Sequence, residues 1–118
     1  MTVRDLLRFP EPGADFHLHL SAFVDEFRRA SVPRREAMIA SGPDRSGAME
    51  GLIAAVVSAL CREVGMEAPA WLAGIHSPEP FFAFPARSFA LRLRLMLEAP
   101  PPFRARNVFV PATFLARA

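Results

Sequence analysis

The chain of 118 residues is long enough for one domain with a modest core, and its 52% hydrophobic content excludes a disordered chain. All 14 basic residues are arginine and the net charge is only +2, so the whole chain lacks the strong positive field of a typical nucleic-acid binder. A small domain has much surface for its volume, so this much apolar material is hard to bury in a monomer. The excess is a first indication of a binding partner.

The single cysteine and the short apolar runs indicate the compartment. Cys61 cannot form an internal disulfide, which favours a reducing compartment, and we expect it to be a small buried hydrophobe. The uncharged stretch Gly51–Cys61 is far short of the roughly 20 apolar residues that cross a bilayer. The N-terminus has no signal-peptide core. We therefore expect a soluble, cytoplasmic protein with no membrane contact.

A helical core is predicted over residues 14–66, after a lead-in over residues 1–13. Asp15 can cap a first helix, which ends before a proline. The apolar face of this helix is formed by Phe16, Leu20, Phe23, Val24 and Phe27. A second short helix, Pro33–Ala40, follows because proline is tolerated in a first helical turn. Ser41–Asp44 then breaks the helical pattern.

The strongest helical pattern covers Met49–Val64. Ser46 is predicted to cap this helix and Gly65 to end it. Its remaining positions are mostly alanine, glycine and serine, so the helix is apolar nearly all round. A helix of this kind is contacted on several sides, and we expect it to be the most buried element of the fold.

Residues 67–86 are rich in proline and aromatic residues. These are Pro69, Trp71, Pro78, Pro80, Phe81, Phe82, Phe84 and Pro85. Proline at this density blocks regular elements, and the aromatic rings need a surface to cover. We predict an ordered loop that lies over the helices.

Residues 87–118 are predicted to form a helix followed by an arginine- and phenylalanine-rich tail. Leu91–Leu95 alternates as a strand does, but no other convincing strand offers a partner and the composition favours a helix over Arg87–Glu98. One face of this helix holds Phe89, Ala90, Leu93, Met96 and Leu97. Three prolines end it. Beyond them Asn107–Val110 is expected to be extended, and Pro111–Leu115 to be a short helix.

Together these elements predict an all-α fold. We expect a small single-domain helical bundle over residues 1–118, with a proline- and aromatic-rich loop and an extended C-terminal segment. No internal repeat divides the chain.

No enzyme chemistry is indicated by the sequence. His17 and His19 could share a metal on a strand, but residues two apart diverge on a helix. The serines lack a nucleophile elbow, and there is no phosphate-binding glycine motif. We expect neither catalysis, nor a cofactor, nor a metal ion.

A DNA-binding transcriptional regulator is the alternative function. A helix-turn-helix could be drawn from the second and third helices, but no basic residue between Ser46 and Cys61 is available to contact phosphates. Residues 87–118 hold six arginines and one acid, so this region could still bind nucleic acid weakly and without sequence preference. The sequence also leaves open whether the chain forms a homo-oligomer.

Arginine beside exposed aromatic rings is the composition of protein-interface hot spots. The candidate partner-binding residues are therefore Trp71, Phe103, Arg104, Arg106, Phe109, Phe114 and Arg117. Residues 103–117 are expected to carry much of the binding energy. The alternative is that the aromatic residues close the core, and the two interpretations can hold for different rings.

Two stretches of the chain carry a further pattern. GLIAAVVSALCREVGMEAPAWL, Gly51–Leu72, contains Gly-x-x-x-Pro-x-Trp at Gly65, Pro69 and Trp71. EAPPPFRARNVFVPATFLARA, Glu98–Ala118, ends in Leu-x-Arg-Ala at Leu115, Arg117 and Ala118. Before that end it loosely matches a motif at Pro100, Phe103, Arg106, Asn107, Val108, Phe109 and Val110. Over residues 49–118 the chain resembles a group of small bacterial proteins encoded beside nucleotidyltransferase-like proteins.

The resemblance implies a function. Such neighbours are commonly interpreted as toxin–antitoxin pairs in which the small protein is antitoxin-like. This chain would then neutralise a nucleotidyltransferase-like protein by binding it, without catalysis of its own. Members of the group often carry an N-terminal DNA-binding segment, and this chain shows no clear one.

Overall fold

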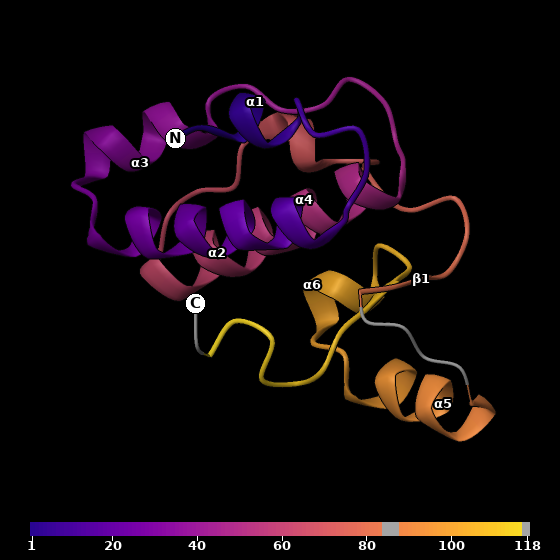
Figure 1. The fold of residues 1–118 in the computed structure, drawn as a ribbon. Helices are drawn as coiled ribbons and strands as arrows, with labels where there is room; N and C mark the ends of the chain where they lie inside the picture. Colours follow the sequence, from indigo (N-terminus) through magenta and orange to yellow (C-terminus); the bar gives the residue numbers. More distant parts are fainter. Residues whose placement is uncertain (84–87, 117–118) are drawn as a thin grey trace.

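The mainly helical fold is confirmed by a computed structural model, which describes residues 1–83 and 88–116 (Figure 1). The elements in these residues are α1 (Val3–Leu6), α2 (Ala14–Arg29), α3 (Val32–Ile39), α4 (Ala48–Val64), the 3-10 turn η1 (Ala70–Leu72), β1 (Phe81–Phe82), α5 (Phe89–Glu98), α6 (Pro101–Arg104) and β2 (Val108–Phe109). One hydrophobic cluster joins buried side chains from α1 through β2, so both ends of the chain contribute to the same core.

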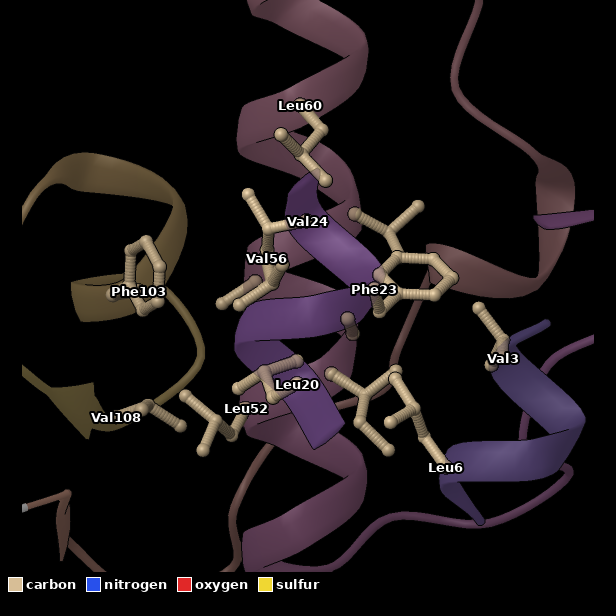
Figure 2. Packing of buried hydrophobic residues seen from close by; sticks show 14 of the residues in the cluster. Val3, Leu6, Leu20, Phe23, Val24, Leu52, Val56, Leu60, Phe103 and Val108 are labelled. Atoms are coloured by element: carbon tan, nitrogen blue, oxygen red, sulfur yellow. The ribbon is translucent and has the colours of Figure 1, made fainter. Parts of the chain in front are cut away.

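Helix α4 lies at the centre of this core, as its apolar composition predicts. Its buried residues run almost without a break from Met49 to Cys61. In Figure 2, Phe103 lies on one side of α4, and Val3 and Leu6 of α1 lie on the other. Contact on several sides explains why the helix needs no polar face.

Both ends of α4 are set by glycine. Gly65 ends the helix in the left-handed conformation, with φ 71°, as predicted. At the other end Gly47, not Ser46, occupies the N-cap position. The Ser46 hydroxyl instead donates to the Gly74 carbonyl oxygen at 3.0 Å and accepts from the His76 amide at 3.1 Å. The predicted cap is wrong because a contact distant in sequence uses that side chain.

The lead-in over residues 1–13 contains a helix that the sequence analysis missed, α1. A capping box starts it: the Asp5 amide donates to the Thr2 hydroxyl, and the Thr2 amide donates to the Asp5 carboxylate. Val3 and Leu6 then lie fully buried in the core. A helix of four residues is too short to show a periodic pattern, which is why only its cap could have indicated it.

Helix α2 packs on α4 through the apolar face that its spacing predicts. The buried residues of this face are Phe16, Leu20, Phe23, Val24 and Phe27. Asp15, expected to cap the helix, lies in its first turn, and Gly13 occupies the N-cap position. Near the other end, the Arg28 guanidinium donates two hydrogen bonds of 2.9 Å to the carboxylate of Glu63 on α4. This ion pair joins the two helices at the surface.

The predicted loop over residues 67–86 contains two short elements in its described part, η1 and β1. Strand β1 pairs in parallel with β2, with Phe81 opposite Val108 and Phe82 opposite Phe109. The pairing adds a two-stranded sheet to the predicted all-α fold, and its second strand lies in the segment Asn107–Val110 that was expected to be extended. The two strands are far apart in sequence and have two residues each, so neither has a detectable alternation of its own.

The chain after residue 88 departs from the prediction in two places. The predicted helix Arg87–Glu98 is confirmed as α5 from Phe89 onward; Arg87 lies outside the described residues. The prolines end α5, but Pro101 also begins α6, because its fixed φ suits a first helical turn. The predicted helix over Pro111–Leu115 is a series of turns instead. Figure 1 shows α5 at one end of the molecule, apart from helices α1 to α4.

Candidate functional site

The aromatic residues predicted for partner binding lie mainly in the core. Phe103 and Phe109 are buried, and Figure 2 shows Phe103 on α6, beside α4. Trp71 is half-buried; its indole N–H donates to the Ile39 carbonyl oxygen at 2.8 Å. Phe114 is also half-buried, with its ring edge-on to Phe103 at a centroid distance of 5.7 Å. These four rings therefore lie in the core or pack against it, as the alternative interpretation expected.

The arginines predicted for partner binding are separated by the structure. The Arg106 guanidinium donates to the carbonyl oxygens of Pro102 and Leu72, at 3.1 and 3.5 Å, and its Nε is buried without a hydrogen-bond partner. Burial lowers the pKa of this guanidinium from its usual value. Arg106 therefore joins α6 to η1. Arg104 is exposed, and Arg117 lies outside the described residues.

A set of exposed apolar residues that the sequence analysis did not assign to binding lies on α5. Four side chains at positions i, i+4, i+7 and i+8 form one continuous stripe, since residues three and four apart are neighbours on a helix. Their exposed fractions are 81% for Phe89, 44% for Leu93, 40% for Met96 and 70% for Leu97. We call these four residues the α5 stripe. The helical periodicity predicts this face, but not that it points away from the core.

Helix α5 is attached to the body by its opposite side. Leu95 is buried in the core cluster, and so is Ala99 directly after the helix. The Ser88 hydroxyl accepts a hydrogen bond from the Leu91 amide and caps the N-terminus. The helix packs against β2. It is therefore fixed in orientation, and the α5 stripe faces outward.

A groove runs between α5 and the chain around β1. Its volume is about 580 Å³, and its lining residues are Glu79, Pro80, Phe82, Phe89, Arg92, Leu93 and Met96. Three members of the α5 stripe thus form one wall, while Pro80 and Phe82 form the other. The Arg92 guanidinium lies over the Phe82 ring, 5.7 Å from its centroid, which places a positive charge at the groove.

Arginines border the α5 stripe on both sides. Arg92 precedes Met96 by four residues, and Arg94 precedes Leu97 by three, so each is a surface neighbour of a stripe residue. The Arg94 side chain also pairs with Glu98 at 3.0 Å on the exposed side of the helix. An apolar strip edged by arginine has the composition enriched at protein interfaces.

A serine and a histidine meet at the start of α4, but their geometry is not that of a catalytic pair. The Ser46 hydroxyl lies 3.3 Å from Nδ1 of His76. The same Nδ1 lies 2.8 Å from the Gly74 carbonyl oxygen, which can only accept, so Nδ1 must carry the proton in that bond. A protonated Nδ1 cannot accept the serine proton. The contacts tie the loop at Gly74 to the start of α4.

The other histidines and the cysteine are engaged in packing or in hydrogen bonds within the fold. His17 packs edge-on against Phe114, and burial lowers its pKa, while the Nδ1 of His19 bonds the Asp15 carbonyl oxygen at 2.8 Å. Cys61 is buried as predicted, which raises the pKa of its thiol. Within residues 1–83 and 88–116, no group of three or more His, Cys, Asp or Glu residues is placed to hold a metal ion.

Comparison with protein families, curated proteins and solved structures gave no match to this chain. In the part of the chain that the structure describes, none of the helices has the length and hydropathy needed to span a membrane.

Proposed function

We propose that this chain is a non-enzymatic protein-binding partner that docks through the α5 stripe. The observation that carries the proposal is the outward-facing apolar surface of Phe89, Leu93, Met96 and Leu97 on a capped and anchored helix. Contiguous apolar side chains on a soluble surface are typical of protein interaction sites. A helix can enter a partner's groove through apolar anchors that are three and four residues apart on one face, and the residues of the α5 stripe are spaced in this way.

The function is the one implied by the resemblance, but the binding surface is α5 in place of residues 103–117. The partner is a nucleotidyltransferase-like protein encoded beside this chain, which the chain neutralises in the manner of an antitoxin. The resemblance over residues 49–118 supports this choice, and that region includes α5. Binding energy is assigned to α5, because Phe103 and Phe109, expected to bind, are buried and would have to leave the core to reach a partner.

The test uses purified proteins and a matched pair of double variants. Phe89→Gln with Leu97→Gln changes the two most exposed stripe residues, and Leu18→Gln with Val32→Gln changes exposed apolar residues on α2 and α3. Isothermal titration calorimetry with the protein encoded beside this chain should show binding by wild type and by the second variant. The stripe variant should bind at least ~10-fold more weakly, as expected when interface anchors are removed.

Neutralisation gives the second readout. Co-expression of wild type with the neighbouring protein should restore growth that the neighbour alone inhibits, and the stripe variant should restore it less well. If wild type neither binds nor neutralises the neighbour, the antitoxin-like proposal is wrong. Tight, sequence-selective binding of duplex DNA at physiological salt would favour the regulator instead.

A further inference from the structure

A second pocket lies where the turn after η1 meets the chain that follows α6. Its volume is about 290 Å³, and its lining is formed by residues 72–76 together with Ala105 and Arg106. None of these residues belongs to the α5 stripe or to the groove beside it. This pocket is therefore separate from the surface of the proposed function.

The Arg106 guanidinium brings a positive charge to this pocket without a counter-charge from the fold. Its hydrogen bonds go to two carbonyl oxygens, and no carboxylate within residues 1–83 and 88–116 is paired with it. Burial that no anion offsets lowers the pKa of this group. Because a charge drawn out of water is stabilised by an opposite charge, an anion gains more here than beside an exposed arginine.

The rest of the lining adds two polar groups and, among the described residues, no acid. One group is the backbone amide of Gly74, which has no hydrogen-bond acceptor in the described part of the chain. The other is the His76 ring, whose Nδ1 is bonded to the Gly74 carbonyl oxygen, so that Nε2 is the nitrogen available to a ligand. This nitrogen donates when the ring is protonated and accepts from a P–OH group when the ring is neutral.

A phosphate group matches these polar groups better than a carboxylate does. Inorganic phosphate and phosphate monoesters present at least three terminal oxygens, whereas a carboxylate or the phosphodiester of a nucleic acid presents two. We infer that the pocket binds a small phosphate, either as the free ion or as a monoester. Arg106 supplies the charge, and Gly74 and His76 bond the remaining oxygens. The apolar part of the lining, Leu72 and Ile75, is left for a group attached to the phosphate.

The first test is a titration of the full chain with sodium phosphate, followed by amide chemical shifts in NMR at constant ionic strength. Shifts at Gly74, His76 and Arg106 should saturate with an apparent Kd of about 1 mM or tighter, which a ligand of ~5 non-hydrogen atoms can reach. Acetate and chloride should bind at least ~10-fold more weakly, because they carry less charge and fewer oxygens. Equal affinity for acetate would overturn the assignment to phosphate, and shifts that do not saturate would overturn the site itself.

A matched pair of variants at Ala73 tests the role of charge without altering Arg106. Ala73 lines the pocket and is exposed, so a longer side chain there should leave the fold unchanged. Ala73→Glu adds a carboxylate that repels phosphate or pairs with Arg106, and Ala73→Gln adds a neutral side chain of the same length. Phosphate affinity should be at least ~10-fold lower in Ala73→Glu than in Ala73→Gln. Equal affinities of the two variants would overturn the inference.

The source of the phosphate group is identified by repeating the titration with phenyl phosphate. Tighter binding of phenyl phosphate than of inorganic phosphate would assign a monoester whose attached group contacts Leu72 and Ile75. Tighter binding of inorganic phosphate would assign the free ion. The stripe variant, Phe89→Gln with Leu97→Gln, should bind phosphate as wild type does, so that this site and docking on α5 are tested independently.

Discussion

Arg104 and Arg106 lie two residues apart in the arginine-rich tail and carry the same side chain. Only the Arg106 guanidinium is hydrogen-bonded within the fold, whereas Arg104 is exposed. The two carbonyl partners of Arg106, on Pro102 and Leu72, are brought together by the fold, and the Leu72 carbonyl comes from a distant turn. No local pattern marks such a residue. Substituting both arginines would therefore mix a structural effect with an effect on binding, so the two positions have to be tested one at a time.

The two arginines should differ in their effect on stability. Arg106→Gln should lower the free energy of unfolding by about 1–2 kcal/mol, because it removes hydrogen bonds to carbonyl oxygens that are worth about 0.5–1.5 kcal/mol each. Arg104→Gln should change it by less than about 0.5 kcal/mol, as is usual for an exposed residue. Urea denaturation of both variants measures the difference. Equal effects would show that the carbonyl contacts of Arg106 do not stabilise the fold.

The ion pair between Arg28 and Glu63 predicts a pH dependence. The hydrogen bonds from Arg28 lower the pKa of Glu63 below its usual value of 4.5. A depressed carboxyl pKa stabilises the fold above that value and loses its contribution as the pH falls through the folded-state pKa. The pair is partly exposed, so its contribution is at most ~1 kcal/mol. Wild type should therefore be more stable than Glu63→Gln at pH 7, and the difference should vanish in acid; a difference that persists at pH 2 contradicts this assignment.

At the scale of elements, α4 and α5 show how far a periodic pattern can be used. Helix α4 is apolar all round, so its central position could be predicted without knowing its neighbours. Helix α5 has one apolar face, and the pattern gives the residues on it but not the direction in which it points. That direction follows from burial of Leu95 and Ala99 and from packing against β2, and these contacts depend on chain segments distant in sequence.

Two of the shortest elements, α1 and β1, could not be predicted for a different reason. Helix α1 has four residues and strand β1 has two, which is about one period of the patterns that identify helices and amphipathic strands, so no repeat can be seen in either. Strand β2, in contrast, lies in the segment Asn107–Val110 that was predicted to be extended. The prediction of partner-binding residues was affected by both limits, the unknown direction of an apolar face and the shortness of some elements. Whether each aromatic ring predicted for binding closes the core or faces solvent depends on those short elements.

A matched pair of leucines tests the contrast between α4 and α5. Leu60→Ala in α4 should cost ~2–5 kcal/mol of unfolding free energy, because it leaves a cavity in a closely packed core. Leu97→Ala in α5 removes the same atoms from a side chain that is 70% exposed and should cost less than about 0.5 kcal/mol. Thermal or urea unfolding compares them. A large cost at Leu97 would mean that the α5 stripe is covered in the free protein.

The whole molecule is elongated, with principal extents of 43 × 26 × 26 Å, and α5 lies at one end of it (Figure 1). A partner can therefore reach α5 and its groove without displacing the core around α4. In the sequence, residues 87–118 hold six arginines and one acid, Glu98, so this region carries a net positive charge. The same charge makes weak contact with nucleic acid an expected side effect.

Binding of duplex DNA by the free protein should be weak, independent of sequence and steeply reduced by salt, because it depends on release of counterions from phosphates. Fluorescence anisotropy with two unrelated duplexes at low and physiological salt checks this. A marked preference for one duplex at physiological salt would mean that part of the molecule contacts base edges. That result would favour a DNA-binding transcriptional regulator.

Docking on α5 is the central claim, and hydrogen–deuterium exchange of the full chain with and without the protein encoded beside it tests this claim most directly. The amides of α5 are part of an exposed helix and should exchange readily in the free protein, whereas those of α4 open only near the global free energy of unfolding. On binding, exchange within residues 91–98 should slow at least ~10-fold, because a covered helix opens less often. Slower exchange confined to residues 101–116, with exchange in α5 unchanged, would contradict docking on α5 and would show that the partner binds the C-terminal tail.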